Sequence, residues 1–280
     1  MTHARPAEVA PGVQRFDART PTLPPATTTN SYALGTRELL LVEPATPFDD
    51  EQRAWRQWAE SLASAGRNLR AIFVTHHHPD HVGGAEALSR SLGLPLWGHP
   101  ITADLLPQLQ FERRLEEGEV IDLDGPEPQR WTCLHTPGHD RGHLCLEEAT
   151  SRIQVVGDMV ASIGTILIAP GDGDLQVYLE QLARLRDRKP TVALPAHGDP
   201  IEDPRGKYQH YIDHRLMREG KVVAALGPEA VALSTLVKAV YDDVPPAVWP
   251  LAELSLHAHL LKLQSEGRAV WGEPGWSHSV

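Results

Sequence analysis

The short segment THHHPDHVGG holds four histidines and one aspartate, and four of these five side chains are spaced as metal ligands. They form the pattern His-x-His-x-Asp-His. Alternate side chains of an extended chain point the same way, so His76 and His78 can face one cation together. Asp80 and His81, where the chain is expected to turn into a helix, can face a second position. Imidazole and carboxylate groups in this number are typical of a zinc site.

Three later loops each offer one further ligand. His139 stands in TPGHDRGH, Asp158 follows VVG, and His197 stands in PAHG. Each of these residues comes shortly after an apolar stretch that predicts a strand. A carboxylate at a strand end suits a position between two cations. Any one of these loops would be a weak signal, and the argument for a metal centre depends on all of them.

Predicted strands alternate with predicted helices along the part of the chain that must position these loops. Strand-like stretches are expected at 31–34, 38–42, 69–74, 95–97, 131–135, 142–146, 153–156 and 191–194, and helices at 49–65, 85–92 and 174–188. Strands that alternate with helices favour a layered α/β architecture. The histidine-rich loops directly follow strands, at the edge where such folds place their chemistry.

The character of the chain changes near residue 206. Helical patterns at 207–225, 233–241 and 251–266 precede a short strand pair that contains Trp271 and Trp276, which predicts a small winged-helix-like unit. The expected organisation is an N-terminal arm over 1–29, rich in Pro, Thr and Ala, a catalytic domain over 30–205 and a helical C-terminal domain over 206–280.

The order of the motifs resembles the metallo-β-lactamase superfamily over most of 30–204. The resemblance implies a four-layered αββα sandwich and a binuclear site. Its ligand sets would be His76, His78 and His139 for one metal, and Asp80, His81 and His197 for the other, with Asp158 bridging the two.

The C-terminal part narrows the resemblance further. The run YIDHR at 211–215 and the tail after it are similar to the β-lactamase-like protein 2 family. That family includes single-strand endoribonucleases, and related layouts act as thioesterases. The resemblance also suggests that His214 and Arg215 lie near the active-site mouth and bind substrate.

One position departs from the superfamily pattern. Members usually carry an Asp-Gly turn after the second strand, whereas this chain has Leu41-Val42-Glu43-Pro44. We expect Glu43 to orient a ligand imidazole from behind the metal centre.

Composition excludes several classes of function. The net charge is −11 with His neutral, which argues against a chain built mainly to bind phosphate backbones. From residue 206 onward seven cations and eight anions give −1, so no double-stranded DNA reader is expected and the tail would cover the cleft or form a homodimer contact. No signal peptide or membrane span is visible. Cys133 and Cys145 are interpreted as buried strand residues. A cytoplasmic enzyme without a membrane partner is therefore expected.

The leading hypothesis is a hydrolase of a small-molecule thioester or other carboxylic ester. A hydroxide bridging two divalent metals, zinc by default with manganese or iron as alternatives, would attack the carbonyl, and Asp80 would handle its proton. Three alternatives remain. The first is a metal-dependent endoribonuclease acting on single-stranded RNA, and the second is a non-catalytic binding module. The third is a mononuclear iron persulfide oxygenase that uses His76, His139 and Asp158.

Overall fold

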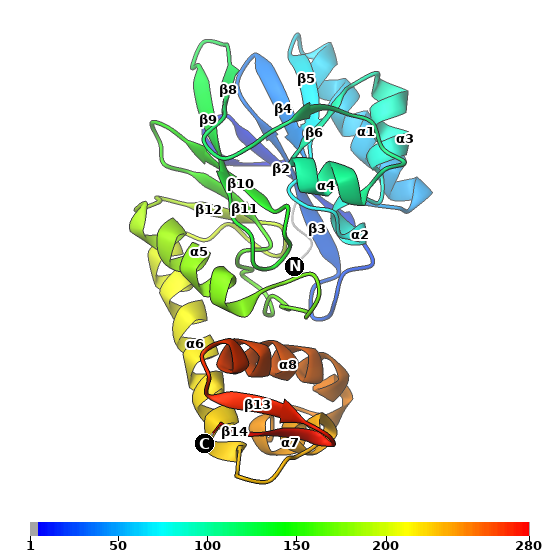
Figure 1. Cartoon of the computed structure of the whole chain (residues 1–280). Helices are drawn as coiled ribbons and strands as arrows, with labels where there is room; N and C mark the ends of the chain where they lie inside the picture. The colour runs from blue at the N-terminus through cyan, green and yellow to red at the C-terminus, as the bar shows by residue number, and fades with distance from the viewer. Residues whose placement is uncertain (1–4, 280) are drawn as a thin grey trace. The chain divides into compact units, whose positions relative to one another are not determined.

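The computed structural model of the chain describes residues 5–279, and these residues form two compact units. The first unit comprises the residues up to 136 together with 142–165 and 189–204. The second comprises 137–141, 166–188 and the residues from 205 onward. Figure 1 labels most of the elements of both units.

The first unit is built on two sheets. In the seven-stranded sheet the strands lie side by side in chain order, antiparallel up to β4 and parallel from β4 to β7. They are β1 (Ala7–Ala10), β2 (Val13–Arg19), β3 (Thr28–Leu34), β4 (Glu38–Val42), β5 (Asn68–Phe73), β6 (Leu96–Gly98) and β7 (Phe111–Arg114).

The second sheet has five strands in the spatial order β12-β11-β10-β9-β8. All its neighbours are antiparallel except β11 and β12, which run parallel. Its strands are β8 (Val120–Leu123), β9 (Gln129–His135), β10 (Leu144–Glu148), β11 (Gln154–Gly157) and β12 (Ala193–Pro195). Cys133 and Cys145 are buried in β9 and β10 as free thiols, as expected.

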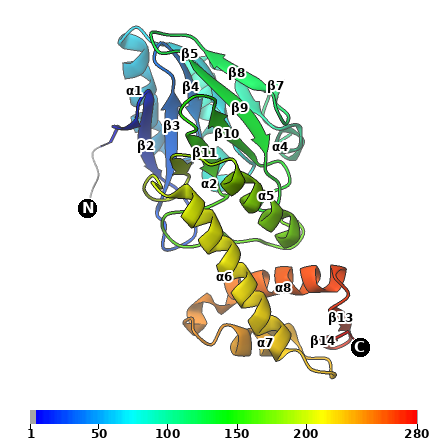
Figure 2. The same ribbon diagram turned by 90° about the vertical axis from the view of Figure 1, so that its left-hand side faces the viewer.

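The run Leu39–Val42 shows why the central strands are apolar on both faces. Leu40 and Val42 pack between the two sheets, against residues such as Trp131 of β9. Leu39 and Leu41 point the other way and pack with Trp55 of the covering helix. A strand buried on both sides needs a continuous apolar run rather than an alternating one. Figure 2 shows the two sheets facing each other.

Helices cover the outer face of the seven-stranded sheet. The helices of this unit are α1 (Asp49–Ser64), α2 (Pro79–Val82), α3 (Ala85–Leu92) and α4 (Pro100–Leu105). Trp55 and Trp58 of α1, with Leu88 of α3, form the core beneath them. Pro79 at the start of α2 suits the first helical turn, where its missing N–H is not needed.

The second unit contains the remaining elements. They are α5 (Leu175–Asp187), α6 (Pro204–Ala225), α7 (Leu233–Val240), η1 (Pro246–Val248), α8 (Trp249–Ser265), β13 (Ala269–Gly272) and β14 (Gly275–His278). Residues of α6, α7, α8 and the β13–β14 hairpin share one apolar core around Leu236, Leu256 and Trp276. The expected helices and the strand pair with two tryptophans are therefore present. None of the helices within 5–279 is long and apolar enough to cross a membrane.

The expectation of a loose N-terminal arm over 1–29 is wrong for the described part of that segment. Residues of β1 and β2 pair with one another and with β3, and Val13 and Phe16 are buried. Arg15 is also buried, where its guanidinium makes an ion pair of 2.9 Å with Asp199. Residues 1–4 lie outside the described part of the chain.

Candidate metal centre

One edge of the first unit collects the ends of strands from both sheets. The chain leaves β5 at Phe73 and enters the histidine-rich segment, while β11 ends at Gly157 and β12 at Pro195. The two edges are joined, because the Leu144 N–H of β10 donates to the Thr75 carbonyl at 2.9 Å. Side chains that follow these strands therefore converge.

His76 and His78 meet as the alternation of an extended chain predicts. His76 Nε2 lies 2.9 Å from His78 Nδ1, and His76 Nδ1 lies 2.9 Å from the Thr75 hydroxyl. Nitrogen ligands about 2.0–2.1 Å from a tetrahedral zinc ion lie roughly 3.3 Å from one another. The two imidazoles are thus close enough to share one cation.

A second cluster brings together Asp80, His81, Asp158 and His197. His81 Nε2 is 3.8 Å from Asp80 Oδ2 and 3.6 Å from Asp158 Oδ2. His197 Nε2 is 3.5 Å from Asp80 Oδ2 and 3.4 Å from Asp158 Oδ1. These separations are longer than good hydrogen bonds and close to the spacing of ligands around one cation. The donor set and its spacing therefore fit a divalent metal ion.

Electrostatics of this cluster favour positive charge at its centre. Burial alone would lower the pKa of His81, but the carboxylates of Asp158, Asp80 and Glu43 outweigh it and hold the pKa well above the usual value. Burial likewise opposes charge on His197, yet Asp158 raises its pKa to about 10. For Asp80 and Asp158 burial would raise the pKa, and the neighbouring imidazoles lower it far below the usual range. The cluster thus attracts positive charge, carried by protons or by a metal ion.

Glu43 lies directly behind His81. The residue is 1% exposed, and its Oε1 is 3.2 Å from His81 Nδ1. The same oxygen accepts a hydrogen bond from the Thr75 hydroxyl. The residue has φ of 60°, a left-handed conformation that is uncommon outside glycine and asparagine. The carboxylate is therefore placed to orient the His81 ring, as the position after the second strand suggested.

His143 supports the backbone of Asp158. The Asp158 N–H donates to His143 Nε2 at 3.1 Å, and His143 Nδ1 lies 2.8 Å from the Thr136 hydroxyl. Gly157 makes this approach possible. Its φ is +47°, and a Cβ at this position would lie 2.5 Å from His143 Nε2. The Gly-Asp pair thus has a physical reason, because only glycine leaves room for the supporting ring.

The other expected site residues belong to the second unit. His139 is buried, and its Nδ1 lies 2.8 Å from the Leu167 carbonyl oxygen. Arg215 is buried with a guanidinium N–H donated to the Ile166 carbonyl, and His214 on the same helix is half-buried. Metal binding by His139 and substrate binding by His214 and Arg215 stay predictions.

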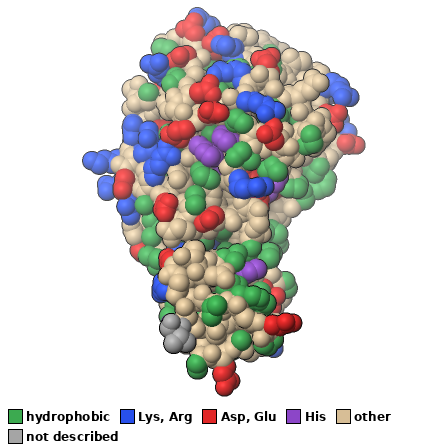
Figure 3. Space-filling model, viewed as in Figure 1, with side chains coloured by type: hydrophobic (Ala, Val, Ile, Leu, Met, Phe, Trp, Pro, Cys, Tyr) green, Lys and Arg blue, Asp and Glu red, His purple; other side chains and the backbone are tan. Residues whose placement is uncertain are grey.

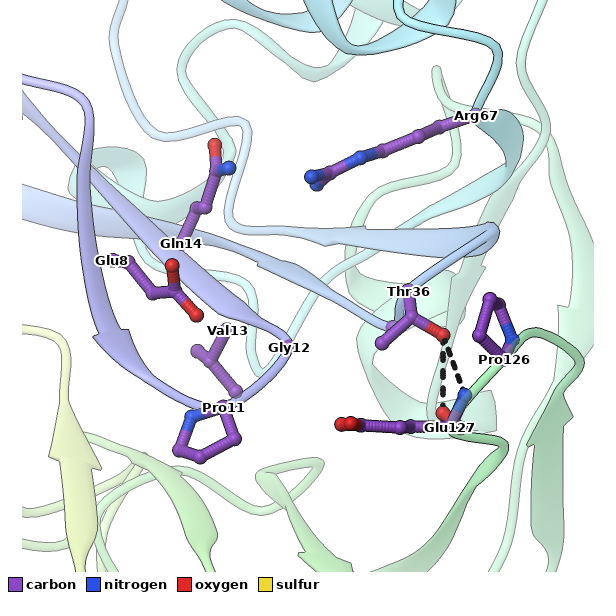
Figure 4. A pocket seen from close by; sticks show the side chains of 10 residues that line it. Glu8, Pro11, Gly12, Val13, Gln14, Thr36, Arg67, Pro126 and Glu127 are labelled. Atoms are coloured by element: carbon purple, nitrogen blue, oxygen red, sulfur yellow. Dashed lines mark hydrogen bonds between the residues drawn. The ribbon is translucent and has the colours of Figure 1, made fainter.

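A separate pocket of about 410 Å³ lies at the opposite edge of the first unit. It is formed by the β1–β2 and β3–β4 turns and by the loop before β9, where the Thr36 hydroxyl donates to the Glu127 carbonyl at 3.1 Å (Figure 4). Its lining has no histidine or cysteine, so it does not compete with the histidine-rich edge as a candidate catalytic site. The lining residues are Glu8, Pro11, Gly12, Val13, Gln14, Gly35, Thr36, Arg67, Pro126 and Glu127.

Comparison with protein families identifies two matching regions. Residues 24–197 match the family described as Metallo-beta-lactamase superfamily. Residues 233–276 match the Beta-lactamase associated winged helix domain. The first region takes in the strands from β3 to β12, and the second takes in α7, α8, β13 and the first part of β14.

Individual proteins show the same similarity along most of the chain. A Beta-lactamase-like protein 2 homolog of Drosophila melanogaster is 28% identical over 251 residues, which cover 86% of this chain and 83% of that protein. An Atrochrysone carboxyl ACP thioesterase of Aspergillus chevalieri is 28% identical over 260 residues, covering 87% and 78%. The solved structure of a Beta-lactamase domain protein from Burkholderia ambifaria superposes with a TM-score of 0.81 at 23% identity, covering 98% and 93%. The expected fold and the winged-helix unit are thereby confirmed.

Proposed function

The chain belongs to the metallo-beta-lactamase superfamily of metal-dependent hydrolases, and we propose that it cleaves a thioester or another carboxylic ester at a binuclear, zinc-preferring centre. The observation that carries the proposal is the second cluster, in which Asp80, His81, Asp158 and His197 approach one another at 3.4–3.8 Å. A protein that used one metal alone would not need this second set.

We assign the ligands as the motifs suggest. His76 and His78 hold one metal with His139, whose loop leaves the sheet after β9 and returns at β10. Asp80, His81 and His197 hold the other. We assign Asp158 as the bridging ligand; its backbone is held by His143, and its two oxygens face His81 and His197 of the second cluster.

The protein's own groups would then prepare the reaction. When bound, two divalent cations polarise the scissile carbonyl and lower the pKa of a water molecule toward about 7. Asp80 Oδ2 lies between His81 and His197 and is placed to accept the proton of the attacking water. Glu43 and the Thr28 carbonyl, which lies 3.0 Å from His197 Nδ1, hold the two rings with Nε2 toward the carboxylates.

The acidic charge of the chain, together with one named relative, supports a thioester over RNA as the substrate that we propose. A relative named as an acyl carrier protein thioesterase aligns with 87% of this chain. The charge of −11 opposes binding to a polyanion, and acidic and basic side chains are interspersed on the face that Figure 3 shows. Single-strand RNA cleavage and iron-dependent persulfide oxidation are therefore outcomes of the test rather than proposals.

An activity screen on the chain loaded with zinc, and in parallel on the chain loaded with ferrous iron, tests this function. The panel contains acyl thioesters, lactones and other carboxylic esters, single-stranded RNA and a persulfide. We expect thioester or ester hydrolysis that a chelator abolishes and zinc restores, with little dependence on salt. RNA cleavage whose binding weakens steeply with salt, or oxygen consumption on the persulfide, would replace the ester assignment.

A further inference from the structure

The loop that carries His139 is held from two sides within the second unit. The Leu167 carbonyl can only accept a hydrogen bond, so the 2.8 Å contact requires that His139 Nδ1 carries the proton. Nε2 is then the nitrogen with the lone pair, as a metal ligand requires. The position of the Leu167 carbonyl therefore decides both the tautomer and the direction of the ring.

Arg215 of α6 binds Ile166, the residue directly before Leu167. Its guanidinium donates to the Ile166 carbonyl, and its central carbon lies 5.9 Å from the ring centroid of Tyr178. The residue is only 4% exposed. A buried guanidinium bonded to a backbone carbonyl is poorly placed to reach a substrate, but it is well placed to fix the segment that Leu167 belongs to.

Tyr178 of α5 contacts the loop that carries His139, at Gly138. Gly138, the residue before His139, has φ of +129°, and a Cβ there would lie 2.4 Å from Tyr178 Cα. The Gly138 carbonyl also accepts the N–H of Asp174, the residue that caps α5, at 2.8 Å. The histidine loop thus packs against the backbone of α5 at Tyr178, and the ring of this residue lies beside Arg215.

We propose that Arg215 is a positioning residue through which helix α6 sets the tautomer and direction of His139, so that the C-terminal unit contributes directly to metal affinity. The proposal rests on the assignment of His139 as a ligand in the proposed function. It gives the winged-helix unit a task that does not involve nucleic acid, and it gives Arg215 a different task from the substrate contact that the resemblance suggested.

The chain offers a closely matched control. Arg218, one turn further along α6, is equally buried, at 5% exposure. Its guanidinium makes two bonds of 2.7 and 2.8 Å to Asp243 and one to the Val240 carbonyl, away from the segment at 166–167. Arg218→Met therefore removes the same charge and the same side-chain volume from the same helix without touching the support of His139.

The test compares Arg215→Met, Arg215→Lys and Arg218→Met in the full-length chain by two measurements that need no substrate. The first is the zinc dissociation constant from competition with a chelating dye. The second is the ¹⁵N spectrum of the metal-free imidazoles, with the His139 signals assigned by their loss in His139→Gln. We expect Arg215→Met to weaken zinc binding roughly tenfold to hundredfold and to mix the His139 tautomers. Arg215→Lys, which can still donate one hydrogen bond, should recover part of both effects, and Arg218→Met should change zinc affinity less than twofold.

Normal zinc affinity and an unchanged His139 tautomer in Arg215→Met would overturn the proposal. A variant with those properties but a raised KM for an anionic ester would return Arg215 to substrate binding. If Arg215→Met and Arg218→Met lost zinc affinity equally, the cause would be a general loss of stability in α6. This result would also overturn the proposal. If Arg215→Met does not fold, the zinc affinity and the His139 tautomer of Arg215→Lys decide the question. A chain that binds zinc as described but hydrolyses no ester would contradict the proposed function and leave this inference standing.

Discussion

Replacing Glu43 by glutamine isolates the charge behind His81. The amide oxygen of glutamine can still accept the Thr75 hydroxyl, so the change keeps volume and one hydrogen bond while it removes the negative charge 3.2 Å from His81 Nδ1. Because the carboxylate is buried, solvent does not screen this interaction as it would at the surface.

The size of the effect follows from that contact. A hydrogen bond to a charged group contributes about 1.5–3 kcal/mol, and about 1.4 kcal/mol corresponds to a tenfold change in a binding constant. The variant should therefore bind its second zinc ion roughly tenfold to hundredfold more weakly. This range agrees with the loss of about 10–100-fold that is typical when a residue supporting a metal ligand is removed.

Competition with a chelating dye measures this affinity, and near-ultraviolet circular dichroism of the metal-free protein checks that the fold is kept. The matched control is Glu38→Gln, the same chemical change at the other end of β4, where the carboxylate pairs with Arg70 at 2.7 Å. The control should bind both zinc ions normally. Unchanged affinity in a folded Glu43→Gln, or an equal loss in the control, would refute the role given to Glu43.

Three further predictions concern catalysis, the metal centre and acid stability. Asp80→Ala should abolish ester hydrolysis in a steady-state assay with little change in the near-ultraviolet spectrum, and near-normal turnover would remove this residue from the proton path. Gly157→Ala should displace His143, because the new Cβ would lie 2.5 Å from its Nε2, and weaker zinc binding with the fold retained is the expected result; normal binding would show that the ring can move at no cost. His259 is 1% exposed, neither of its ring nitrogens has a hydrogen-bond partner in the described chain, and burial, reinforced by neighbouring cations, lowers its pKa to about 3. The unfolded state then binds the extra proton below pH 6.5, so stability is full above that pH and falls by about 1.4 kcal/mol per unit as the pH drops toward 3. Urea unfolding of His259→Leu should lack this pH dependence of the free energy of unfolding, which amounts to about 2 kcal/mol between pH 6.5 and 5. The control His257→Leu, at a half-buried residue, should retain it. The same pH dependence in both variants would contradict the account.

The parts of the fold that sequence predicted well are those whose local pattern is decided by burial. The run at Leu39–Val42 is apolar because both faces of β4 are covered, and the helix after His81 shows the spacing of one buried face. Four strands escaped prediction, namely β1, β2, β7 and β8, and β2 shows one reason, because its burial depends on a distant partner. Arg15 makes β2 look like part of a polar arm, and only the ion pair with Asp199, 184 residues away, explains its burial.

In the candidate site, too, local sequence predicted the residues of one short segment but not the contacts made by distant parts of the chain. His76, His78, Asp80 and His81 stand in one short segment, so their convergence follows from strand alternation and one turn. The support of His139 could not be read from the chain, because its partner is a backbone carbonyl 28 residues away and carbonyls leave no mark in a sequence. The approach of His143 to the backbone of Asp158 could not be predicted either, because it depends on how β10 and β11 pair.

The most direct test of the binuclear centre is elemental analysis of the purified chain after saturation with zinc and removal of excess metal. The two clusters predict two zinc ions per chain in the wild type. They predict one in His81→Ala, because the Asp80–His197 cluster loses an imidazole while His76 and His78 are untouched. A single iron atom in the wild type, with no second site filled by zinc or any other divalent metal, would contradict the account.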